Sequence, residues 1–281
     1  MLLIARVRVG SRPRYATRSC FEQKALGPAH EAPRKLTAFS QINLSSRLRA
    51  LRLRVRHERS PQALKPSSIL VALAIDLLLC VATELEGAIL HDRLGTDSTI
   101  RIVRMGVGPV NAAHAVTLVL ARETPGAIVV CGVGGAYPSS GLRVGDVVCA
   151  EVECYGDLGA ASPAGFLDMK ALGFPVVPSP VALYNDLPMQ VFPSERRVKF
   201  VTMSTCTGTD AAARAIESRT GGAVENMEGA AVAHVAHLHG VPVGEVRGIS
   251  NIVTDRDTSS WRLREAAAAA QEAVLAWIAR R

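Results

Sequence analysis

The chain has 281 residues, of which 48% are hydrophobic and only 4% are aromatic. This composition indicates an aliphatic core and favours an α/β domain over a β-sandwich. The six cysteines include no Cys-x-x-Cys pair, and no secretion signal accompanies them. We therefore expect reduced thiols in a cytoplasmic protein, and the pattern argues against a cysteine zinc site.

The net charge of +7 is unevenly distributed. Residues 1–68 hold 15 basic and 3 acidic residues, which leaves 17 basic and 22 acidic residues for 69–281. Three interpretations fit this leader, which we expect to be disordered: a transit peptide, a tail for membranes or nucleic acid, or translated sequence upstream of the true start. We favour the third, so that 69–281 is the folded domain and binds neither nucleic acid nor a membrane.

Apolar runs and alanine-rich runs alternate along the rest of the chain, starting with an apolar run too short to span a membrane. The apolar runs predict strands at 75–82, 100–108, 126–136, 144–156, 196–206 and 243–250. The alanine-rich runs predict helices at 83–94, 109–123, 210–220, 227–240 and 259–281. This alternation predicts one α/β domain with a central, mostly parallel mixed sheet flanked by helices.

Residues at the ends of these elements support their boundaries. Pro109 suits the first turn of a helix, and Gly240 suits a helix end. Ser259 or Ser260 is the expected N-cap of the last helix. Residues 157–195 are rich in Pro and Gly and predict a long irregular insertion.

Polar residues and glycines follow several predicted strands, where ligands bind in such sheets. Gly134 and Gly135 belong to a glycine-rich loop whose N–H groups can approach a ligand, although a tight turn explains them equally. Glu84 and Glu86 point about 200° apart on a helix, so only one can face a site. Glu228 suits the grip of two vicinal ribose hydroxyls, but each acid also fits a helix N-terminus.

The segment after the last strand offers an amide and two further acids. Asn251 has one acceptor and two donors and can face the edge of a heterocycle, or simply form a turn. Asp255 and Asp257 suit caps or charge partners. His234 and His237 share a helix face, but without an H-E-x-x-H pattern we expect surface histidines and no metal.

Together these motifs resemble the nucleoside phosphorylase and nucleosidase superfamily, from about residue 75 onward. The motifs are Glu86, "GVGPVNAA" (106–113), "GVGGAYPSSGLRVGDVV" (132–148), "ENMEGAA" (225–231) and "RGISNIV" (247–253). "GVGPVNAA", "GGAYP" and "ISNIVTDRDTSSW" (249–261) resemble the futalosine hydrolases in particular. The resemblance implies the three-layer phosphorylase/hydrolase-like fold, a homo-oligomer, most simply a dimer, and no cofactor. It also implies release of hypoxanthine from futalosine by hydrolysis, leaving dehypoxanthine futalosine, in menaquinone biosynthesis.

The resemblance also implies roles for individual residues. Glu86 matches the base that activates water, and Glu228 matches the ribose ligand, with Met227 packed against the sugar. Thr207 or Thr205 is expected near the purine, and Asp255 or a water is expected to supply the proton.

Asn251 occupies the position where adenine-specific members carry an Asp acid. An amide can donate to O6 of a 6-oxopurine, so Asn251 favours futalosine over methylthioadenosine. Adenine nucleosidases and nucleoside phosphorylases remain alternatives. Phosphorolysis needs an anion site, and Arg104 is the one residue near these loops that suggests it. Phe166, Phe174 and Tyr184 are candidates for the pocket of the 5′ group, and Trp261 for a cap over the ligand.

Overall fold

The computed structural model describes residues 73–281, and the predicted leader 1–68, with its boundary at residue 69, lies outside them. The described chain is built on an eight-stranded mixed sheet. Its strands are β1 (Leu73–Val81), β2 (Ile100–Arg104), β3 (Glu123–Ala136), β4 (Val147–Tyr155), β7 (Asp186–Pro188), β8 (Arg197–Thr202), β9 (Val224–Asn226) and β10 (Val243–Ile252).

Part of this sheet closes on itself. The order is β10-β4-β8-β9-β3-β1-β2, and β10 also pairs with β3, so that five strands form a closed ring. Five pairings are parallel, and β10–β4, β3–β9 and β4–β7 are antiparallel. The expected central, mostly parallel mixed sheet is therefore confirmed, and β1 and β2 extend it beyond the ring.

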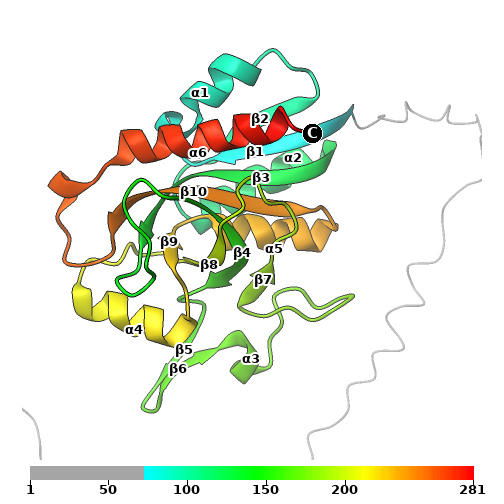
Figure 1. Cartoon of the computed structure of the whole chain (residues 1–281). Helices are drawn as coiled ribbons and strands as arrows, with labels where there is room; N and C mark the ends of the chain where they lie inside the picture. The colour runs from blue at the N-terminus through cyan, green and yellow to red at the C-terminus, as the bar shows by residue number, and fades with distance from the viewer. Residues whose placement is uncertain (1–72) are drawn as a thin grey trace, which may run out of the picture. The chain divides into compact units, whose positions relative to one another are not determined.

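Helices cover both faces of the β1–β3 region (Figure 1). α1 (Glu84–Leu94) and α6 (Leu263–Ile278) lie on one face, and α2 (Pro109–Leu120) and α5 (Gly229–His239) lie on the other, whereas α4 (Asp210–Thr220) lies away from this region. Side chains alternate along β1, because Leu77 and Leu79 pack with α1 and α6, whereas Leu78 packs with α2 and α5. The α4 helix packs over Tyr137 and Val253 in a smaller cluster. The predicted flanking helices are thus confirmed.

Two expectations about helix ends have different outcomes. Pro109 is the first residue of α2, and Gly240 ends α5 in the left-handed conformation with φ of 68°, as predicted. The expected N-cap of the last helix is wrong, because Ser259 and Ser260 lie in a short 3-10 helix, η1 (Thr258–Ser260). The α6 helix begins after Arg262, whose side chain makes no capping hydrogen bond.

The predicted irregular insertion at 157–195 contains a hairpin and a short helix. The elements are β5 (Gly159–Ser162), β6 (Gly165–Asp168) and α3 (Met169–Leu172). Asn185 holds the insertion together by donating to the Tyr155 and Leu158 carbonyls and accepting from Met169 N–H. His234 and His237 on α5 contact the carbonyls of Val176 and Pro188 at 2.8 and 3.0 Å, so they tether the insertion.

Candidate active site

A cavity of about 310 Å³ opens where β1, β3, β9 and β10 end. It is lined by Ala82, Thr83, Leu85, Glu86, Val107, Val133, Gly134, Gly135, Cys206, Thr207, Glu225, Asn226, Met227, Glu228, Arg247, Asn251, Val253, Trp261 and Leu263. Of the eight residues to which the sequence assigned a catalytic or substrate-binding role, seven line this cavity: Glu86, Asn251, Met227, Glu228, Gly134, Gly135 and Thr207. Thr205, the alternative to Thr207, does not line it.

Glu86 serves both as a helix cap and as a carboxylate of the cavity. Its Oε2 accepts hydrogen bonds from the N–H and hydroxyl of Thr83 at 3.0 and 2.8 Å, which completes a capping box at the start of α1. Its Oε1 accepts a hydrogen bond from Val133 N–H at 2.9 Å, and the whole residue is only 4% exposed. Glu84 points away and lies 3.5 Å from Arg104, on the surface. Of these two acids, only Glu86 lines this cavity, in agreement with their predicted opposite directions.

Glu228 directs its carboxylate into the cavity because another residue caps its helix. The Asn226 side chain accepts from the N–H groups of Glu228 and Gly229 at 2.9 and 2.8 Å. Glu228 is therefore free to accept from Gly108 N–H at 3.0 Å and from Arg247 at 3.1 Å. The residue is 3% exposed. Through these two hydrogen bonds its carboxylate connects the glycine turn before α2 with β10.

Arg247 is the central cation of the cavity, and sequence reasoning missed it. Its Nε donates to Glu245 at 2.7 Å, its Nη2 donates to Glu228, and its Nη1 donates to the Val133 carbonyl and lies 3.8 Å from Glu86. Burial lowers the pKa of Arg247, but the charges of the three carboxylates raise it by more than burial lowers it. The guanidinium therefore stays charged. The signal in the sequence was the presence of two charged residues, Glu245 and Arg247, at alternate positions of a buried strand.

The glycine-rich end of β3 lets these charged groups approach its backbone. A Cβ at Gly132 would overlap the Glu86 carboxylate and the Arg247 guanidinium. A Cβ at Gly134 would lie 2.6 Å from Val224 and one at Gly135 would lie 2.7 Å from Val253. The glycines are thus required by close packing. Gly134 and Gly135 also line the cavity. The alternative of a tight turn is wrong, because both glycines lie within strand β3.

Asn251 lies where β10 bulges against Gly135, and its amide is oriented by its neighbours. Ser250 Oγ donates to Asn251 Oδ1 at 2.8 Å, and Asn251 Nδ2 donates to the Ile252 carbonyl at 3.2 Å. These bonds fix which side of the amide is the donor. Each polar atom keeps capacity for one further hydrogen bond to a ligand.

Thr207 is held beside the cavity by a buried acid. Its N–H donates to Glu225 Oε1 at 2.8 Å, and its hydroxyl donates to Glu225 Oε2. Tyr137 O–H donates to the same carboxylate at 2.9 Å, and burial followed by the Glu225 charge raises the pKa of Tyr137. Glu225, which the sequence reasoning left without a role, therefore positions the loop before α4.

Asp255 is the predicted catalytic residue that the structure does not bring into the cavity. Its side chain is exposed, and its Oδ1 accepts from Asp210 N–H at 3.0 Å in the first turn of α4. The alternative of a capping acid explains it. Trp261 does line the cavity, and the Arg256 guanidinium lies 5.0 Å from its ring centre.

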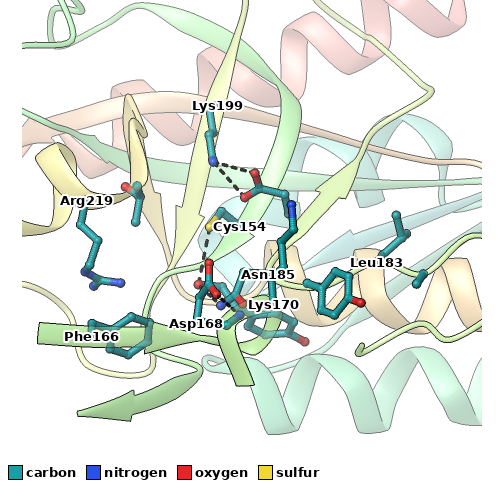
Figure 2. A pocket seen from close by; sticks show the side chains of 14 residues that line it. Cys154, Phe166, Asp168, Lys170, Leu183, Asn185, Lys199 and Arg219 are labelled. Atoms are coloured by element: carbon teal, nitrogen blue, oxygen red, sulfur yellow. Dashed lines mark hydrogen bonds and ion pairs between the residues drawn. The ribbon is translucent and has the colours of Figure 1, made fainter. Parts of the chain in front are cut away.

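The insertion contributes to a second cavity rather than to the first. This cavity, of about 510 Å³, is shown in Figure 2 with Phe166 and Arg219 on one side and Leu183 on the other. Its most buried cation, Lys199, is paired with Asp186 at 2.8 Å. Phe166 and Tyr184 line this second cavity, and Phe174 is 64% exposed. In the described chain, none of these three expected residues lines the first cavity.

Comparison with known proteins gives the family. The family model of the phosphorylase superfamily matches residues 92–279. The futalosine hydrolase of Streptomyces coelicolor is 38% identical over 62% of this chain and 76% of that protein. The Thermus thermophilus futalosine hydrolase is 33% identical over 60% of this chain and 76% of its own length. A 5′-methylthioadenosine/S-adenosylhomocysteine nucleosidase of Arabidopsis thaliana is 28% identical over 62% of this chain and 65% of that protein.

Solved structures share the fold. A 5′-methylthioadenosine/S-adenosylhomocysteine nucleosidase from Colwellia psychrerythraea, bound to adenine, matches with a TM-score of 0.61 at 22% identity. It covers 73% of this chain and 95% of that one. A futalosine hydrolase mutant of Helicobacter pylori has a TM-score of 0.60 at 16% identity and covers 74% of this chain and 100% of that one. The chain belongs to the phosphorylase superfamily and, within it, is related to the futalosine hydrolases.

Proposed function

We propose that this protein is a nucleosidase that hydrolyses the N-glycosidic bond of futalosine, releasing hypoxanthine and dehypoxanthine futalosine. The observation that carries the proposal is the meeting of Glu86, Glu228 and Asn251 in one cavity. A base for water, a ligand for ribose hydroxyls and an amide for the purine are the three groups that this reaction needs. The similarity to the futalosine hydrolases supports the substrate.

In this mechanism Glu86 accepts a proton from a water whose oxygen bonds to the anomeric carbon. The bond between that carbon and the purine nitrogen breaks, and its electron pair leaves with the base. The sugar passes through an oxocarbenium-like transition state, as in glycoside hydrolysis. Glu228 accepts hydrogen bonds from two ribose hydroxyls, and Met227, which lines the same cavity, packs against the sugar.

Asn251 stabilises the departing hypoxanthine. Its Nδ2 has one free donor, because the other hydrogen is directed to the Ile252 carbonyl. That donor reaches O6, where a 6-oxopurine places negative charge as it leaves. Since Asp255 lies outside the cavity, we assign the proton for the departing base to a water molecule.

The charges of the cavity favour water over phosphate as the nucleophile. Arg247 is the only Lys or Arg in the cavity lining within residues 73–281, and its donors already contact Glu245, Glu228 and Val133. Arg104, which suggested an anion site, lies on the surface beside Glu84. A phosphate beside Glu86 would meet a carboxylate without a free cation to offset the repulsion.

The test is detection of free base by chromatography after incubation of the purified full-length chain. The substrates are futalosine, its 6-amino analogue, inosine and methylthioadenosine, each with and without phosphate. We expect hypoxanthine from futalosine without phosphate. Adenine from methylthioadenosine or the 6-amino analogue would assign the protein to the adenine nucleosidases, and strict phosphate dependence would make it a phosphorylase.

We expect Asn251→Asp to lower kcat/KM for futalosine by about 10- to 100-fold, because a carboxylate facing O6 offers no donor and leaves a polar pair unmatched. The measurement is the rate of hypoxanthine release. Asp255→Asn is the matched control, since an Asn can still accept from Asp210 N–H, and it should stay close to the unchanged chain. An equal loss in both variants would return Asp255 to the reaction as the proton donor.

We also propose that the protein is a homo-oligomer of the cytoplasm. The resemblance to the superfamily supports the homo-oligomer. Val107 at the cavity and neighbouring Val110 are 50% and 80% exposed, as an apolar contact surface requires. Free thiols at Cys80, Cys131 and Cys149 agree with a reducing compartment. Within residues 73–281, no helix has the length and apolar character to cross a membrane.

A further inference from the structure

Two acids lie behind the cavity without a role in the reaction described above. Glu153 on β4 and Glu245 on β10 are both 0% exposed, and their carboxyl groups lie side by side, because a Cβ built on Gly229 would overlap both Glu245 Oε2 and Glu153 Oε1. Two carboxylates this close in a buried environment cannot both be ionised at moderate cost. One proton therefore has to be shared between them.

The neighbours of each acid decide where the proton resides. Glu245 Oε1 accepts from Arg247 Nε at 2.7 Å, so its negative charge is directly compensated. Glu153 has only neutral donors as direct partners, the Asn226 side-chain amide and the N–H of Cys154. Burial, and after it the charge of Glu245, raises the pKa of Glu153 well above its usual value. The proton thus belongs on Glu153 and the charge on Glu245.

An unsatisfied atom identifies the acceptor of that proton. Among residues 73–281, Glu245 Oε2 is the one buried side-chain N or O atom without a hydrogen-bond partner. A Cβ placed on Gly229 would overlap Glu245 Oε2 and Glu153 Oε1 together, so these two oxygens meet beside that glycine. A hydroxyl on Glu153 supplies the missing donor. Gly229, which follows Glu228 directly, leaves the space in which the two acids meet.

We propose that Glu153 is a positioning residue of this active site: as a neutral acid it donates to Glu245, which holds Arg247 in the orientation that presents Glu86 and Glu228 to the substrate. The path runs from β4 through Glu245 and Arg247 to both cavity carboxylates. On the other side, Asn226 links Glu153 to the first turn of α5. The role in positioning rests on the proposed function, whereas the shared proton does not.

The charged groups around the pair are few. Glu245 and Arg247 on β10 affect Glu153 most, and Glu228 at the start of α5 adds negative charge near Glu245. Neutral Tyr137 and Tyr155 also lie within the influence of Glu153. With Glu153 protonated, the charge of Arg247 is compensated by three nearby carboxylates rather than four. These are Glu86, Glu228 and Glu245.

The first test locates the proton without using activity. Infrared spectra of the full chain at neutral pH should contain a protonated-carboxyl band that Glu153→Gln removes.

The pH dependence of stability tests independently whether the pKa of Glu153 is raised in the folded protein. Because the folded pKa is raised, Glu153 favours folding below its unfolded value of about 4.5 and loses this contribution as pH rises. The stability of Glu153→Gln relative to the unchanged chain should therefore increase with pH above that value.

The second test concerns positioning and compares a conservative with a non-conservative variant. Glu153→Gln keeps an N–H donor for Glu245 and should retain kcat for futalosine within about threefold. Glu153→Leu removes the donor at similar volume and should lower kcat at least tenfold, with a much smaller change in KM. Equal activity of the two variants would overturn the positioning role.

The outcomes separate the two parts of the inference. Absence of the carboxyl band in the unchanged chain overturns the neutral acid, even if a variant does not fold. If the band is present but the protein does not cleave futalosine, the proposed function fails while the shared proton stands. If Glu153→Gln loses as much activity as Glu153→Leu while both remain folded, the hydrogen bond to Glu245 is not what orients Arg247.

Discussion

We expect Glu86→Gln to lower kcat for futalosine cleavage by about 10²- to 10⁴-fold, the range typical of removing a general base, with KM changed little. A glutamine has nearly the same shape and its oxygen can still accept from Val133 N–H, so the cavity keeps its form. It cannot take a proton from water. The measurement is steady-state hypoxanthine release over a range of futalosine concentrations.

The same substitution should also lower the stability of the protein slightly, and this effect has to be separated from the loss of the base. An amide facing Thr83 loses part of the capping box, which should lower stability by about 1 kcal/mol. Glu84→Gln is the matched control, because that acid is in the same helical turn but points to the surface. If Glu84→Gln reduced kcat as strongly as Glu86→Gln, the assignment of the base would be wrong.

The largest effect on stability should come from Arg247→Met. We expect the free energy of unfolding to fall by about 3–5 kcal/mol, because removing one partner of a buried ion pair leaves charge without compensation. Here three carboxylates, on Glu86, Glu228 and Glu245, lose their common cation. Methionine fills much of the volume, so a lost contact area is not the main cause. Denaturant unfolding of both chains gives the difference.

Arg104→Met provides the comparison on the surface. Arg104 also ends a strand and pairs with a glutamate at 3.5 Å, but both side chains are largely exposed. Its replacement should change the free energy of unfolding by only about 0.5 kcal/mol or less. Similar losses in the two methionine variants would show that Arg247 does not balance the buried acids.

Most elements of the domain are predictable from the sequence because their burial patterns are simple. The helix at 210–220 is observed with the same limits, and the other predicted helices and strands occur within a few residues of theirs. The short elements escaped detection, namely β5, β6, α3, β7, β9 and η1. The β9 strand has three residues, too few for a pattern, and its pairing with β3 and β8 is non-local. The β5–β6 hairpin lies in a segment whose Pro and Gly content suggested a loop.

The candidate site was predictable only where a residue type itself suggests chemistry. Glu86, Glu228 and Asn251 stand at strand or helix ends, where function is expected. Arg247 was missed because the Glu245 and Arg247 charges in one buried strand indicate an ion pair, but the contacts to Val133 and Glu228 come from other elements and are not visible in the sequence. Asp255 was included because it follows Asn251 closely, and chain proximity does not ensure a shared direction.

The closed pairing of β3, β10, β4, β8 and β9 has a consequence for how the protein opens. No strand of this set can leave without breaking hydrogen bonds to neighbours on both sides. The carboxylates and glycines on β3, β9 and β10 therefore belong to a single cooperative unit, which opens only when the whole domain unfolds. Substrate entry and product release are left to the connecting segments around Val107 and Trp261, so the residues that set turnover need not be those that set folding.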